Sequence, residues 1–156
     1  MKPPSISVLG IVILSTIASP ALSLSLNRSA SIEVTFEEQK DELSESERDR
    51  IRQIVEQVRA EDWCPLERVI VVGHASPTEG TPDQAFALSS ERIENVIGVL
   101  QSFGVPKRST YGEAKGIDHR QNMEAPPTAR VEIEFVGMTQ HPECRTPKAA
   151  GGFRAR

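Results

Sequence analysis

The chain has few of the residues that support covalent, redox or metal-dependent chemistry. It contains only two cysteines and three histidines in 156 residues, and the absence of a C-x-x-C pair argues against redox catalysis. His141 and Cys144 are the only potential metal ligands that lie close together in the sequence, so no metal site is expected. No nucleophile stands at a recognisable spacing from His74, which we interpret as a structural residue at a strand end. We therefore expect neither an enzyme nor a cofactor.

Long hydrophobic runs are also scarce. The apolar run from Ile6 to Ala18 follows Lys2 and precedes Ala21-Leu22-Ser23, which places small residues where a signal peptidase inspects them. We expect residues 1–23 to be a signal peptide that is cleaved after Ser23, with an uncleaved anchor as the alternative. No cysteine lies near this cleavage site, so a lipid anchor is not expected, nor is a transmembrane segment in the mature chain.

An excess of positive charge is missing as well. Of the 18 basic residues only Lys2 precedes the expected cleavage site, so the mature chain carries 17 basic and 22 acidic residues, a net charge of −5. This balance disfavours nucleic acid and anionic lipid as partners. The 133 residues that remain after cleavage suffice for one domain with a single core.

The two cysteines are far apart in the sequence. An even pair in an exported chain is interpreted first as a disulfide, here between Cys64 and Cys144. Such a bridge would close a loop of about 80 residues and stabilise the fold by roughly 4 kcal/mol. Metal binding by the same cysteines is the competing interpretation.

Four segments have the pattern of β-strands. Residues Ile32 to Phe36 alternate between apolar and polar, and Arg130 to Phe135 alternate most strictly. Val69 to Val72 is a continuous β-branched run that ends at Gly73, which indicates a central strand buried on both faces. A shorter candidate extends from Arg108 to Gly112.

Two segments have the pattern of amphipathic helices. A Ser-x-x-Glu capping box at residues 44–47 precedes apolar residues that recur at helical spacing over residues 51–58. Thr81-Pro82-Asp83-Gln84 is a second start signal, and the apolar stripe of that helix extends over residues 88–103 until Gly104 stops it.

The order strand, helix, strand, helix, strand, strand predicts an α+β two-layer sandwich, a mixed β-sheet with helices packed on one face. After the signal peptide we expect an N-terminal linker over residues 24–31 and one domain over residues 32–137. Residues 138–156 are expected to form a tail that is mostly disordered after Cys144.

Several short motifs follow one another in a recognisable order. The residues concerned are Gly73-His74, Gly80, Leu88-Ser89-x-x-Arg92, Val96 and Leu100. Gly104-Val105, Tyr111-Gly112-Glu113 and the stretch from Ala129 to Ile133 follow later. This series resembles the OmpA C-terminal domain family, in which a buried strand ends in Gly-His-Thr-Asp and a helix carries Asn-x-x-Leu-Ser-x-x-Arg. The resemblance covers about Ile32 to Phe135.

This resemblance implies a non-catalytic periplasmic protein that binds the peptide stem of peptidoglycan without a covalent bond. A peripheral location at the outer membrane is part of the same expectation. The diamino acid of that stem presents carboxylate and ammonium groups, so a site for it needs a fixed cation and a fixed anion. Arg92 matches the family's helix arginine and is the candidate carboxylate contact. Arg130 belongs to the closing motif and is a further candidate contact. The alternative for Arg92 is an ion pair with a neighbouring glutamate on an exposed helix face.

The chain departs from the family at three polar positions. Ser76 or Pro77 stands where the family has aspartate, Ala85 replaces the helix asparagine, and Thr128 replaces the asparagine of the closing motif. Two carboxylates near the missing aspartate are candidates to replace it. They are Glu79 in the loop and Asp83 at the helix start, where the helix dipole alone would also favour an acid. Ser76 is a further candidate contact.

Two functional hypotheses follow from this pattern. The first is binding to peptidoglycan through Arg92, with Glu79 or Asp83 as the substitute acid. The second is an interaction or scaffold protein of the envelope, with the same fold and a degenerate pocket, that docks a protein partner.

Overall fold

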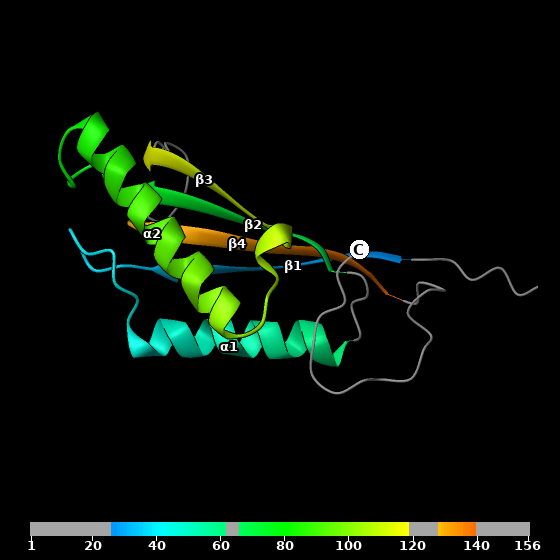
Figure 1. Cartoon of the computed structure of the whole chain (residues 1–156). Helices are drawn as coiled ribbons and strands as arrows, with labels where there is room; N and C mark the ends of the chain where they lie inside the picture. Colours follow the sequence, from blue (N-terminus) through cyan, green and yellow to red (C-terminus); the bar gives the residue numbers. More distant parts are fainter. Residues whose placement is uncertain (1–25, 62–65, 119–127, 140–156) are drawn as a thin grey trace, which may run out of the picture.

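The computed structural model describes residues 26–61, 66–118 and 128–139 and has the predicted α+β architecture. Its elements are β1 (Leu26–Thr35), α1 (Glu45–Ala60), β2 (Leu66–Ala75), α2 (Pro82–Ser102), the 3-10 helix η1 (Lys107–Ser109), β3 (Thr110–Ile117) and β4 (Arg130–Thr139). Both long helices lie on the same face of the sheet (Figure 1). The expected signal peptide and both cysteines lie outside the described residues.

The four strands form one mixed sheet in the order β1-β4-β2-β3. β4 is antiparallel to both of its neighbours, whereas β2 and β3 are parallel and are connected through α2. β2 is therefore an inner strand, as the continuous run over residues 69–72 predicted. It is not buried on both faces as expected, because Ile70 and Val72 on the open face are only partly buried. Among the described residues, no helix is long and apolar enough to cross a membrane.

The pleat of the strands divides the sheet into a core face and an open face. Ile32, Ile133 and Val71 are neighbours across three strands and face the helices as part of the core. One position along, Glu33 pairs with Glu132 on the open face. A one-residue change of register would exchange these faces, so the alternation fixes the pairing.

The outer strand β1 and its partner β4 are longer than the alternation predicted. β1 begins at Leu26, six residues before the expected start at Ile32, and Leu26 pairs with Thr139 at the end of β4. Residues expected to belong to a linker and a tail therefore pair with each other. The extension depends on backbone hydrogen bonds between strands, and these leave no hydrophobic alternation in the sequence.

Both helices begin where the capping signals predicted. The Thr81–Gln84 capping box is complete, with hydrogen bonds in both directions. At α1 the side chain of Ser44 caps the helix, but the carboxylate of Glu47 accepts a hydrogen bond from Thr35 at 2.8 Å instead of closing the box.

Helix α2 lies unusually close to β2, and this proximity positions the site described below. A Cβ atom built on Gly73 would lie 2.5 Å from the backbone oxygen of Ser89, so only glycine allows this approach. The next turn of α2 carries Arg92, which therefore reaches the end of β2 and the loop that follows it.

Candidate functional site

A buried ion pair connects the middle of α2 to the loop that precedes this helix. The side chains of Arg92 and Glu79 are both fully buried. Nη1 of Arg92 donates to Oε2 of Glu79 at 2.8 Å, and Nη2 donates to Oε1 at 2.5 Å. This is the bidentate geometry in which a guanidinium holds a carboxylate most firmly. Burying both charges is costly unless further hydrogen bonds satisfy the remaining polar atoms.

Backbone carbonyls supply those hydrogen bonds for the guanidinium of Arg92. The accepting oxygens are those of Lys40 at 2.8 Å from Nε, His74 at 3.5 Å from Nη1 and Glu37 at 3.4 Å from Nη2. The guanidinium also lies over the ring of Phe36, 5.1 Å from its centroid. Together with the ion pair, these contacts give every one of the five guanidinium donors an oxygen of the chain itself.

Backbone amides complete the coordination of the Glu79 carboxylate. The amide of Ser76 donates to Oε2 at 2.7 Å, and the amide of Gln39 donates to Oε1 at 2.7 Å. Burial alone would raise the pKa of this carboxyl, but the hydrogen bonds from Arg92, Ser76 and Gln39 outweigh burial and lower the pKa below its ordinary value. The group is therefore ionised at neutral pH, and four donors converge on its two oxygens.

The loop between β1 and α1 adopts an uncommon conformation to reach this carboxylate. Gln39 has a φ of 59°, in the left-handed region that residues other than glycine rarely occupy. Such a conformation costs on the order of 1 kcal/mol or more and persists only where the surroundings favour it. Here the favourable contact is the hydrogen bond from the Gln39 amide to Glu79.

A second arginine lies within a cluster of acids on the open face of the sheet. Arg130 is 1% exposed and donates through Nη2 to Glu132 at 2.8 Å, its Nε lies 3.2 Å from Glu33, and Nη1 contacts Asp118. The Nε2 atom of His74 lies 3.5 Å from Glu132. Burial, and then the charge of Arg130, lower the pKa of His74 from its ordinary value of 6.5. The histidine is therefore neutral at pH 7.

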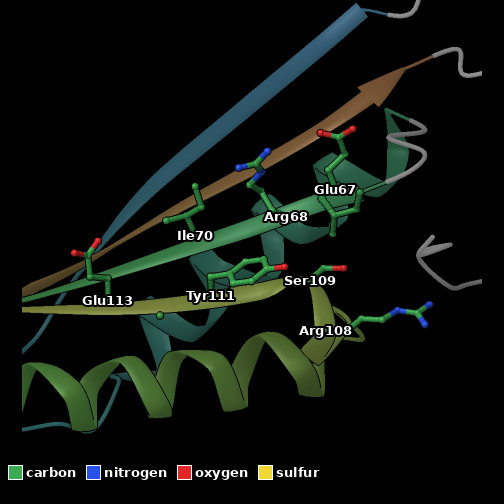
Figure 2. A pocket seen from close by; sticks show the side chains of 9 residues that line it. Glu67, Arg68, Ile70, Arg108, Ser109, Tyr111 and Glu113 are labelled. Carbon is green, nitrogen blue, oxygen red and sulfur yellow. The ribbon is translucent and has the colours of Figure 1, made fainter.

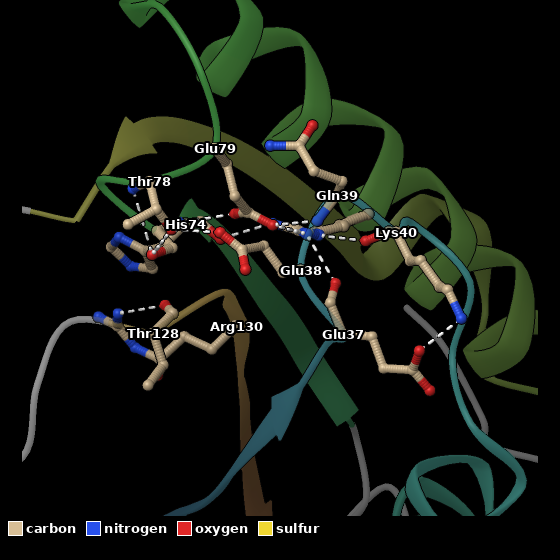
Figure 3. Close-up of polar contacts among 11 residues, drawn as sticks. Glu37, Glu38, Gln39, Lys40, His74, Thr78, Glu79, Thr128 and Arg130 are labelled. Carbon is tan, nitrogen blue, oxygen red and sulfur yellow. Dashed lines mark hydrogen bonds and ion pairs between the residues drawn. The ribbon is translucent and has the colours of Figure 1, made fainter.

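His74 contributes to the surroundings of both arginines, and Figure 3 shows its side chain beside Arg130. Its backbone oxygen accepts from Arg92, while its ring faces the cluster around Arg130. This agrees with the structural role predicted for it at the end of β2. In the described part of the chain, no three histidine, cysteine, aspartate or glutamate side chains are placed to hold a metal ion.

The structure brings three of the five predicted contact residues together. Arg92, Glu79 and Ser76 meet at the end of β2, whereas Arg130 belongs to the separate cluster. Asp83 lies exposed in the first turn of α2. Of the two candidate acids, Glu79 is therefore the one that reaches the arginine.

The sequence did not indicate the loop that closes this site. Glu37, Gln39 and Lys40 contact the ion pair through backbone atoms. Any residue type supplies such atoms, so no motif marks the contribution. The distinguishing feature of this loop is the left-handed conformation of Gln39. The residue type does not reveal this conformation, because residues other than glycine rarely adopt it.

A groove of about 710 Å³ lies elsewhere on the open face, along β2 and β3. Figure 2 shows the side chains of Arg68, Ile70, Tyr111 and Glu113 along it. Neither Arg92 nor Glu79 lines this groove, and its lining carries charges of both signs.

The fold and the site define a class of protein: a two-layer α+β domain with a carboxylate bound to an arginine beyond the end of an inner strand. The OmpA family model matches residues 35–134, which is well over half of the chain. The chain belongs to the OmpA family. A search of curated proteins finds no match.

Solved structures with the same fold come from several bacteria. The OmpA-like domain of FopA1 from Francisella tularensis has a TM-score of 0.59 and 17% identity, and the match covers 71% of this chain and 74% of that one. The peptidoglycan-associated lipoprotein from Burkholderia pseudomallei has a TM-score of 0.55 and 18% identity, over 66% and 88% of the two chains. A periplasmic domain of MotB from Helicobacter pylori has a TM-score of 0.56 and 16% identity, over 70% and 74%. At these identities the similarity establishes the fold.

Proposed function

We propose that this chain is a non-catalytic protein of the bacterial cell envelope that binds the peptide stem of peptidoglycan non-covalently in the periplasm. Membership of the OmpA family supports this proposal. So does the fold shared with a peptidoglycan-associated lipoprotein and with a periplasmic domain of MotB. Export through a signal peptide at residues 1–23, a Cys64–Cys144 disulfide and a peripheral place at the outer membrane are parts of the same proposal.

The proposed site is the end of β2, with Arg92 as the carboxylate contact and Glu79 as the acid for the ammonium group. Ser76 and Asp83 lie in the same segment of chain, and Arg130 lies beyond His74. One observation carries this proposal: a carboxylate already lies on Arg92, held by the guanidinium and by two backbone amides. The site thus has the donors that a ligand carboxylate needs.

The absence of catalysis in this proposal is supported by the surroundings of His74. Its ring faces Arg130 and Glu132, and the carboxylate of Glu132 is held in an ion pair with Arg130 at 2.8 Å. Release of soluble muropeptides from sacculi by the purified chain would contradict a purely binding role.

The proposal is tested by co-sedimentation of the purified full chain with isolated peptidoglycan sacculi. Wild type is expected to sediment with sacculi, and Arg92→Lys is expected to lose most of this retention because an ammonium cannot hold a carboxylate in two parallel bonds. Arg48→Ala is the matched control, since Arg48 lies exposed on α1. Circular dichroism verifies that each variant is folded. Folded wild-type protein that stays in the supernatant would refute the proposal.

A second candidate function is docking of a protein partner in the envelope. The observation that favours it is the complete burial of Arg92, whose donors are all satisfied within the chain. Ala85, at the position of the family's asparagine, is buried as well. Stoichiometric co-purification with one protein from envelopes treated to remove peptidoglycan, with no retention on sacculi, would favour docking over wall binding.

A further inference from the structure

The carboxylate of Glu79 occupies the place that the proposed ligand carboxylate would take. Two guanidinium nitrogens and two backbone amides donate to it, all within 2.8 Å. These four donors come from three separate segments, namely Arg92 on α2, the Gln39 loop and the Ser76 turn. They form a complete receptor for one carboxylate, and no donor is left for a second.

We propose that Glu79 is a built-in competitor: it occupies the carboxylate receptor of Arg92, and an external carboxylate binds only by displacing it. This inference depends on the proposed function for the identity of the ligand, but the displacement itself can be tested with a simple carboxylate. Because both anions use the same donors, binding is an exchange of one bidentate pair for another.

The segment that carries Glu79 is built to allow this exchange. Residues 76–79 form a turn in which the amide of Glu79 donates to the carbonyl of Ser76 at 3.0 Å. Pro77 and Thr78 in this turn are exposed, and Gly80 follows with a φ of 101°, a conformation that glycine adopts without strain. Rotation of this surface turn can withdraw the carboxylate without moving β2 or α2.

One further contact holds the turn closed. The hydroxyl of Thr78 donates to the carboxylate of Glu38 at 2.6 Å, which ties the turn to the β1–α1 loop. Both side chains are exposed, so this tie is weak in water. The closed state therefore depends mainly on the buried pair.

An internal competitor makes the site selective. Glu79 is attached to the protein, so its effective concentration at Arg92 is at least in the millimolar range, and a simple carboxylate must overcome it. A ligand that carries an ammonium group beside its carboxylate gains a second contact, because the displaced Glu79 is then free to bind that ammonium. The site is expected to discriminate against simple carboxylates and in favour of zwitterionic groups.

The exchange predicts a gain of binding when Glu79 is neutralised. In Glu79→Gln the side-chain amide has a nitrogen that must face either a guanidinium or an amide donor, so the glutamine cannot fill the receptor. Acetate is the probe, compared with chloride at equal ionic strength through its effect on the melting temperature of the full chain. We expect acetate to bind Glu79→Gln about tenfold or more tightly than wild type, the factor given by the weakest coupling measured between close charge pairs.

Two control variants isolate the competitor. Glu91→Gln removes one negative charge from the exposed side of α2, next to Arg92 in the sequence, and it is expected to bind acetate as weakly as wild type. Glu79→Gln combined with Arg92→Lys is expected to lose the acetate effect. Glu79→Ala is the second variant to use where Glu79→Gln is unfolded, because acetate can then restore the missing carboxylate directly.

Sedimentation with sacculi separates this inference from the proposed function. Arg92-dependent retention of wild type, together with an acetate effect in Glu79→Gln, supports both. An acetate effect without retention by any folded variant supports the competitor and refutes wall binding. Arg92-dependent retention without an acetate effect in folded Glu79→Gln or Glu79→Ala supports wall binding and refutes the competitor, and the lack of both effects refutes both.

Discussion

The buried ion pair makes a quantitative prediction about stability. In Arg92→Ala the carboxylate of Glu79, which is fully buried in the wild type, loses its counter-ion, and breaking such a pair costs about 3–5 kcal/mol. A typical domain is stable by only about 5–15 kcal/mol. At roughly 3–4 °C per kcal/mol for a domain of this size, a loss of about 4 kcal/mol lowers the melting temperature by about 12–16 °C.

The assay is urea and thermal unfolding followed by circular dichroism, arranged as a double-mutant cycle. Arg92→Met combined with Glu79→Leu replaces both charges with apolar groups, and this double variant is expected to recover most of the stability lost in either single variant. Arg48→Ala, an exposed arginine, is expected to change stability by less than about 0.5 kcal/mol. A loss below about 1 kcal/mol in Arg92→Ala would show that the pair is not buried in solution, and it would refute the reasoning.

Two further predictions concern the contacts of β2. Gly73→Ala places a methyl group 2.5 Å from the backbone of Ser89, so it is expected to destabilise the domain by about 1–3 kcal/mol. Gly98→Ala on the exposed face of α2 meets nothing within 4 Å, so it is expected to stabilise the domain by about 0.5–1 kcal/mol. Equal effects of the two substitutions in urea unfolding would contradict the close approach. Because the pKa of His74 is lowered in the folded state, its contribution is fully present above pH 6.5 and declines as the pH falls below that value. Wild type is therefore expected to lose more stability than His74→Gln between pH 7.5 and about pH 5.5, and parallel pH profiles of the two unfolding free energies would contradict this.

The sequence predicted the elements because each has a local signal. The Thr81–Gln84 capping box and the continuous run over residues 69–72 depend on neighbours within a few positions. The capping box and the inner position of β2 are confirmed, whereas the predicted burial of β2 on both faces is wrong. The ends of β1 and β4 were underestimated, because residues such as Asn27 extend an outer strand through backbone pairing alone. Local pattern thus fixes which element forms, and long-range pairing fixes how far it extends.

The site was only partly predictable, because its geometry depends on contacts between distant segments. The matched arginine was identified, but its partner was left open between a ligand and a neighbouring glutamate on an exposed helix face. The observed partner is Glu79, in the preceding loop, and the pair is buried instead of exposed. Burial results from the close approach at Gly73 and from the loop around Gln39, neither of which is visible in the residue types near Arg92.

The departures from the family pattern acquire a different meaning once this geometry is known. Ser76 or Pro77 stands where the family has aspartate, but Glu79 brings a carboxylate to Arg92 from further along the loop. An acid elsewhere in the loop thus supplies a charge that residue-by-residue matching records as lost. The substitutions therefore do not by themselves distinguish wall binding from protein docking. The property that distinguishes them is whether Arg92 can exchange its internal carboxylate for an external one.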